Sequence, residues 1–125
     1  MLEFYNINPT GRHVGDCTVR ALTKALDLDW ETAYALLCLQ GFVMHDMPSS
    51  NAVFGAVLKE NGFAKAVIPD TCPDCYTLED FANDHSKGLF VVGMSGHVAT
   101  VEDGVIYDAW DSRSEIPIYV WAKKS

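Results

Sequence analysis

Apolar residues recur at helical spacing through the first half of the chain. Val19, Leu22 and Leu26 lie three or four residues apart behind Asp16, a residue type that often caps a helix N-terminus. The same kind of spacing returns in two later segments. We therefore expect an irregular loop over the first dozen residues, followed by helices after Asp16, from Asp29 to Gly41, from Asn51 to Asn61 and, more briefly, over 77–85.

After residue 62 the pattern changes to short runs rich in β-branched and aromatic residues. Asp103 and Gly104 lie between two of these runs and are a strong signal for a two-residue hairpin turn. Because helices come first and strands last, we expect an α+β fold with N-terminal helices packed on a small C-terminal antiparallel β-sheet. No repeat or linker divides residues 1–125, which predicts a single domain. The predicted strands are 63–68, 88–93, 97–102, 105–109 and 116–122.

The net charge and the length of the apolar runs exclude some classes of binding partner. The 125 residues are 49% hydrophobic, and 17 Asp and Glu against nine Lys and Arg give a net charge of -8. This charge opposes binding to nucleic acid and to anionic membrane surfaces. No apolar run reaches the roughly 18 residues that a membrane-spanning helix requires. The first residues lack the basic start and apolar core of a secretory signal, so we expect a cytoplasmic protein.

One cysteine is placed to act as a nucleophile. Cys17 falls in the first turn of the helix predicted after Asp16, where unpaired backbone N–H groups and the helix dipole stabilise a thiolate. A nucleophilic thiol also needs a base. His97 is the best placed of the four histidines, because it opens a predicted central strand that would hold its ring rigidly. Taken alone, Cys17 is more simply explained as a buried packing residue, and His97 could equally be a half-buried histidine with its hydrogen bonds satisfied.

The hairpin register selects a carboxylate for His97. If Asp103 and Gly104 form a two-residue turn, His97 and Asp108 share one face of the sheet, because side chains alternate along a strand. Asp111 then points to the other face, and a three-residue turn would exchange the two aspartates. The pattern therefore predicts Asp108 as the group that orients His97. Its structural alternative is a turn cap within 108–112.

The segments that carry these residues resemble small papain-like cysteine peptidases. They are most similar to the compact bacteriocin-processing (double-glycine leader) peptidases and to phage- or prophage-encoded relatives of these enzymes. The resemblance covers roughly residues 6–111. It is carried by GDCTVRAL at 15–22, SGHV at 95–98 and VIYD at 105–108.

The resemblance implies a nucleophile helix packed against a sheet that carries His and Asp. It also implies amide hydrolysis through a thioester acyl-enzyme. By position, Cys17 is the nucleophile, His97 the general base and later acid, and Asp108 the orienting carboxylate. These peptidases usually carry a Gln about six residues before the cysteine, where this chain has Gly11. Asn8, the nearest carboxamide, is the predicted substitute in the oxyanion hole, with the Cys17 backbone N–H as second donor.

The predicted function is thus thiol-dependent hydrolysis of an amide bond in a peptide or protein substrate, and it requires no cofactor. Trp110 shares the predicted face of His97. We expect this indole to form a wall of the substrate cleft or, alternatively, to pack in the core.

Two other functions also fit the sequence. One is a non-catalytic interaction protein on the same fold, such as a phage-type modulator of a host protein. The other is a zinc-stabilised binding module that uses Cys72 and Cys75, since a C-x-x-C turn supplies half of a tetrahedral site. His85 and either Cys38 or His45 would then complete the ligand set. Cys38 is otherwise a packing residue of its helix.

Overall fold

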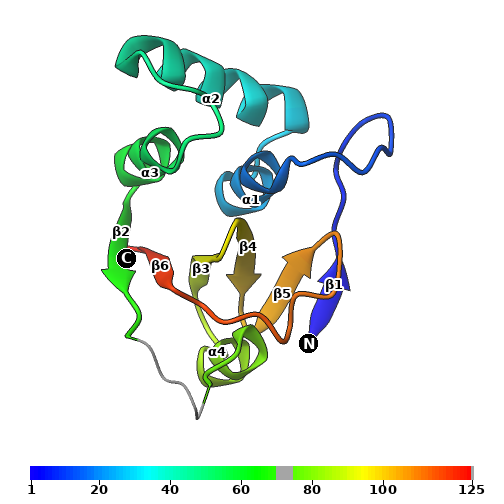
Figure 1. Ribbon diagram of the computed structural model, residues 1–125. Coiled ribbons are helices and arrows are strands. Elements are labelled where there is room, and N and C mark those ends of the chain that lie inside the picture. Colours follow the sequence, from blue (N-terminus) through cyan, green and yellow to red (C-terminus); the bar gives the residue numbers. More distant parts are fainter. Residues whose placement is uncertain (70–74, 125) are drawn as a thin grey trace.

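The computed structural model describes residues 1–69 and 75–124. The segments with periodic apolar residues form helices and strands in it. Within these residues the fold has four helices and a six-stranded mixed sheet (Figure 1). The helices are α1 (Cys17–Leu26), α2 (Trp30–Met44), α3 (Asn51–Glu60) and α4 (Leu78–Asp84). The strands are β1 (Leu2–Phe4), β2 (Phe63–Val67), β3 (Leu89–Met94), β4 (His97–Glu102), β5 (Val105–Asp108) and β6 (Tyr119–Lys123). The predicted α+β class is confirmed.

The sheet differs from the predicted antiparallel one. Its strand order is β1-β5-β4-β3-β6-β2, and β1 pairs in parallel with β5 while the other neighbours are antiparallel. We expected an irregular loop where β1 lies. That expectation was wrong because three residues are too short to show an alternating pattern. The parallel pairing sets Phe4 opposite Asp108, so the N-terminal segment lies beside the end of β5.

The predicted hairpin between β4 and β5 is confirmed. Asp103 and Gly104 both have positive φ, 51° and 79°, as the two central residues of a type I′ turn require. Glu102 pairs with Val105, and the register continues along both strands. The last strand, in contrast, begins at Tyr119 and not at residue 116. Pro117 has no N–H to donate to a neighbouring strand, which delays the start of β6.

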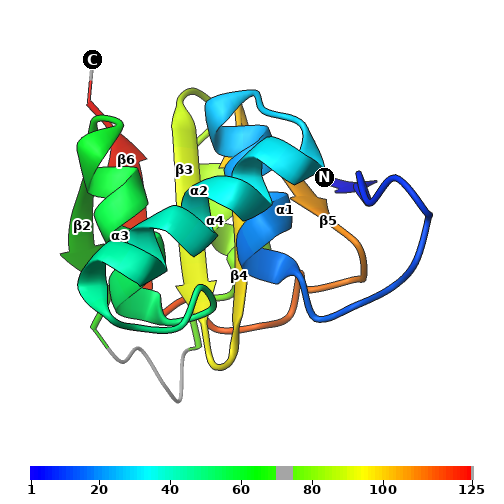
Figure 2. The ribbon, with the colours of Figure 1, turned by 90° about the horizontal axis from the view of Figure 1, so that it is seen from above.

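The helices form layers on the two faces of the sheet. α1 packs directly on β4, and α2 crosses over α1 and α3 as the outermost layer (Figure 2). Leu22, Leu37 and Phe54 from these three helices are almost fully buried in this core. α4 covers the opposite face of the sheet, where Leu78 and Phe81 pack in a second apolar cluster. The first turn of α1 is thereby held at one end of the β4–β5 hairpin.

Gly41 does not end α2, in contrast to the prediction. The helix continues to Met44, and His45 caps it in the left-handed conformation with a φ of 56°. A Cβ on Gly41 would come within 2.7 Å of the Asp46 carbonyl oxygen. The glycine is therefore required for this close approach of the following loop and not for termination. No helix within the described ranges is long and apolar enough to cross a membrane.

Candidate active site

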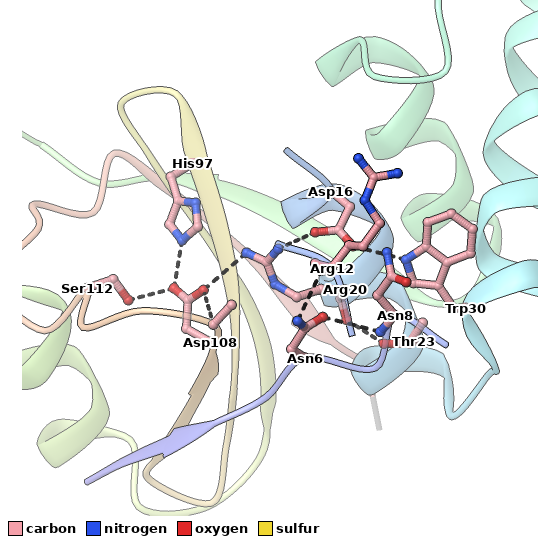
Figure 3. Close-up of polar contacts among 11 residues, drawn as sticks. Asn6, Asn8, Arg12, Asp16, Arg20, Thr23, Trp30, His97, Asp108 and Ser112 are labelled. Atoms are coloured by element: carbon pink, nitrogen blue, oxygen red, sulfur yellow. Dashed lines mark hydrogen bonds and ion pairs between the residues drawn. The ribbon is translucent and has the colours of Figure 1, made fainter. Parts of the chain in front are cut away.

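His97 and Asp108 lie side by side at the same end of the β4–β5 hairpin. His97 is the first residue of β4 and Asp108 the last residue of β5. Their side chains point toward one another, with 2.6 Å between His97 Nε2 and Asp108 Oδ2 (Figure 3). The predicted proximity of the two residues is confirmed. Asp111 lies outside this contact, since its exposed carboxylate binds Arg113.

The Asp108 carboxylate is buried and accepts hydrogen bonds at both oxygens. Oδ2 also accepts from the Ser112 hydroxyl at 2.7 Å, and Oδ1 accepts from the Ala109 N–H at 2.8 Å and from Arg20 Nη2 at 3.3 Å. Burial by itself would raise the pKa of this carboxyl group. The hydrogen bonds from His97 and Ser112 outweigh burial, so the pKa of Asp108 is lowered and the group stays ionised.

Cys17 is the first residue of α1 and is half-buried beside His97. Burial would raise the pKa of its thiol, but hydrogen bonds to the His97 imidazole and the Val98 backbone, with the charges of His97 and Arg20, lower it overall. Burial acts in the opposite sense on His97, yet Asp108 and Cys17 raise the pKa of the imidazole to about 9. These contacts therefore favour the thiolate form of Cys17 and the imidazolium form of His97. Because Asp108 binds Nε2, Nδ1 is the ring nitrogen left for Cys17.

Arg20 connects the helix to this site and was not predicted. Its side chain is buried and binds both Asp16 and Asp108, at separate nitrogens of the guanidinium group. Asp16 occupies the predicted N-cap position, yet its side chain does not cap the first turn. It binds Arg20 instead and accepts a 3.0 Å hydrogen bond from Trp30 Nε1 (Figure 3). The beginning of α1 and the end of β5 are thus joined through one buried cation.

A cavity of about 340 Å³ opens over Cys17 and His97. Trp110 lines this cavity, and its ring centroid lies 4.7 Å from that of His97. Its exposed fraction is 43%, so it forms a wall and is not a core residue. The structure therefore brings together four of the predicted residues: Cys17, His97, Asp108 and Trp110.

The structure does not bring Asn8 to the cavity. Asn8 Oδ1 accepts hydrogen bonds from the backbone and the hydroxyl of Thr10, at 2.9 and 2.8 Å. Asn6 lines the cavity instead. Its Oδ1 accepts from the Asn8 N–H and its Nδ2 donates to the Arg12 carbonyl, which fixes the carboxamide and leaves one N–H of Nδ2. No sequence signal distinguishes the two asparagines, because an irregular loop has no period that assigns its side chains to a face.

The residues of the predicted zinc site are dispersed or lie outside the described ranges. Cys72 lies outside them, and Cys75 is disulfide-bonded. His85 stacks on Phe81 with 4.0 Å between ring centroids, and Cys38 is a free, half-buried thiol. In the part of the chain that the structure describes, no group of three or more His, Cys, Asp or Glu side chains is arranged to hold a metal ion.

No protein-family model, no curated protein and no solved structure matches the chain. The geometry and electrostatics of the described residues are therefore the basis for a function.

Proposed function

We propose that the chain is a thiol-dependent hydrolase of peptide or related amide bonds, with Cys17 as nucleophile, His97 as acid and base, and Asp108 as the orienting carboxylate. The observation that carries the proposal is the 2.6 Å contact of Asp108 with a His97 ring that also bonds Cys17 beneath an open cavity. A nucleophile on a helix and its partners on adjacent strands agree with the papain-like architecture that the sequence resembles. We include that architecture in the proposal.

The chemistry proceeds in two steps, acylation and deacylation. The Cys17 thiolate attacks the carbonyl carbon, which forms a C–S bond and moves the carbonyl electron pair onto oxygen. His97 then gives its proton to the amine nitrogen as the C–N bond breaks and a thioester remains. In deacylation His97 takes a proton from water, the hydroxide adds to the thioester carbon, and the C–S bond breaks to release the acid. Asp108 stabilises the imidazolium in both steps.

In this proposal two groups donate hydrogen bonds to the oxyanion. The Cys17 backbone N–H lies in the first turn of α1, where the Asp16 side chain does not cap it. The remaining N–H of Asn6 Nδ2 lies in a side chain that lines the Cys17 cavity. We assign to Asn6 the role that the sequence predicted for Asn8, since Asn8 is held by Thr10.

This assignment predicts different effects for the two asparagines. Asn6→Ala should lower kcat/KM for hydrolysis by roughly 10²- to 10³-fold, the usual effect of removing one oxyanion donor. Asn8→Ala is the matched control and should change kcat/KM by less than about tenfold, because it removes only contacts to Thr10. Steady-state kinetics of both variants provides the measurement. A larger loss in Asn8→Ala would return the role to Asn8.

The proposed function is tested with p-nitrophenyl acetate, an activated ester that demands no side-chain specificity. We expect a burst of one nitrophenolate per chain, an acetyl group on Cys17 detected by mass spectrometry, and slower continuous hydrolysis as His97 activates water. His97→Ala should lose the continuous phase, whereas Cys38→Ala should keep both phases. Acetylation confined to Cys38, or a burst that survives Cys17→Ser, would reject the proposal.

A second candidate function, a non-catalytic interaction protein on the same fold, is favoured by a different observation. The outer face of α2 exposes large apolar side chains, including Leu39, Phe42 and Val43 at exposed fractions of 62%, 81% and 64%. Such a patch is typical of a surface that contacts another protein. This function predicts no nitrophenolate burst and full biological effect in Cys17→Ala, so the burst assay and this variant discriminate the candidates.

A further inference from the structure

A second cavity lies directly beside the one over Cys17. It also has a volume of about 340 Å³, and the two cavities share Val14 and Gly15. Cys17 faces one cavity, while its neighbours Asp16 and Thr18 face the other. The segment that leads into α1 is thus a ridge between the two cavities. A peptide that crosses Gly15 with its carbonyl carbon at Cys17 would place a neighbouring side chain over the second cavity.

The second cavity has aromatic and aliphatic walls. Trp30 and Tyr34 stack with 5.1 Å between ring centroids and 26° between ring planes. The hydrogen bond from Trp30 Nε1 to Asp16 fixes the indole, as Figure 3 shows. Buried Leu37 contributes from the next turn of α2. A wall that is ordered before binding spares an incoming ring part of the entropic cost of association.

None of the described side chains that line the second cavity offers an unpaired charge to a ligand. Among the side chains that line it, Asp16 is the one carboxylate, and both its oxygens are occupied by Arg20 and Trp30. A charged side chain would therefore lose its hydration there without gaining a partner. An aromatic or large aliphatic side chain would bury apolar surface against Trp30 and Tyr34 instead.

We infer that the second cavity is a recognition site for a bulky apolar side chain, best an aromatic one, next to the bond that Cys17 attacks. The inference rests on the proposed function and names its substrate class. It departs from the double-glycine substrates of the peptidases that the sequence resembles, because glycine residues would leave this cavity empty.

The experiment compares peptidyl vinyl sulfones, in which Cys17 Sγ adds to the vinyl carbon and His97 supplies the proton to the adjacent carbon. The probes are N-acetyl-Gly-Gly vinyl sulfone and two analogues with Phe in place of the first or the second Gly. We expect at least one Phe probe to inactivate Cys17 about tenfold to a hundredfold faster than the Gly-Gly probe. Equal rates, or faster reaction with Gly-Gly, would overturn the inference. Iodoacetamide, which needs no side-chain recognition, reports the reactivity of Cys17 itself.

Variants localise the preference. Tyr34→Ala removes one wall of the second cavity, and Ser49→Trp adds a ring at its rim, so each should reduce the Phe to Gly-Gly rate ratio toward one. Phe42→Ala is the matched control, since Phe42 lies on the same helix, is 81% exposed and does not line the cavity. It should keep the full ratio. A ratio that Tyr34→Ala and Ser49→Trp leave unchanged would place recognition elsewhere and overturn the inference.

A binding measurement separates this inference from the proposed function. In Cys17→Ser, N-acetyl-phenylalanine amide should shift the NMR signal of the Trp30 indole N–H, whereas N-acetyl-glycine amide should not. If Cys17 proves unreactive but the Phe amide shifts this signal, the proposed function fails and the recognition site stands. If Cys17 reacts normally and the Phe amide leaves Trp30 unaffected, the recognition site fails and the proposed function stands.

Discussion

Iodoacetamide is expected to alkylate Cys17 at pH 6 faster than it alkylates an ordinary thiol, because the pKa of Cys17 is lowered. A thiol with the ordinary pKa of 9.0 is only about 0.1% thiolate three pH units lower. Burial pushes the pKa of Cys17 in the unfavourable direction, but the hydrogen bonds to His97 and Val98 lower it. His97→Ala removes the main hydrogen bond that lowers the pKa of Cys17, while burial still raises it. The pKa of Cys17 should therefore rise, and alkylation at pH 6 should fall steeply.

The two classes of probe should have different pH profiles. Above pH 9 the His97 imidazolium loses its proton, because Asp108 and Cys17 raise its pKa to about 9. The thiolate persists there, so alkylation by iodoacetamide, which releases iodide and needs no acid, should not decline. Addition to a vinyl sulfone needs the His97 proton and should decline above pH 9.

Asp108→Asn provides the control for this pH limit. The substitution removes a charge that raises the pKa of His97, so the decline with the vinyl sulfone should move to lower pH. Rates are measured by mass spectrometry of the Cys17 peptide. A decline that does not move in this variant would show that Asp108 does not set the pKa of His97.

The part of this site that the sequence predicted is the part that depends on local rules. The Asp103–Gly104 turn fixes the register of its own hairpin, and the two-residue period of a strand then brings Asp108 to His97. Both rules act over about a dozen residues. The predicted helix start at Cys17 likewise follows from the residues around it.

The missed features depend on contacts between distant segments. Leu2 pairs with Ile106, and nothing within the first strand marks that partner. Asp16 and Arg20 have the i, i+4 spacing of a surface ion pair, and arginine is rarely buried. Arg20 is buried here because Asp108, 88 residues further along the chain, accepts a hydrogen bond from its Nη2 atom. Sequence periodicity contains no information on such a partner.

Arg20→Met should destabilise the fold by about 3–5 kcal/mol, the cost of removing one partner from a buried ion pair. Methionine matches the length and volume of the arginine stem, so the change removes the charge with little loss of packing. The Asp16 and Asp108 side chains, exposed by only 5% and 1%, would then remain as carboxylates without the cation between them. Denaturant unfolding at pH 7 measures the loss.

Two comparisons distinguish lost charge compensation from lost packing. Arg113→Met removes the arginine of an exposed pair with Asp111 and should leave stability nearly unchanged, since solvent already screens that pair. The hydrogen bonds that lower the pKa of Asp108 stabilise the native fold above the unfolded-state pKa of about 4, and this stabilisation is lost as pH falls. In Arg20→Met, acid protonates the buried carboxylates that have lost their guanidinium partner, and this removes the cost of burying their charge. The stability difference from the parent chain should therefore shrink between pH 7 and pH 4, whereas a deficit caused by packing would stay constant.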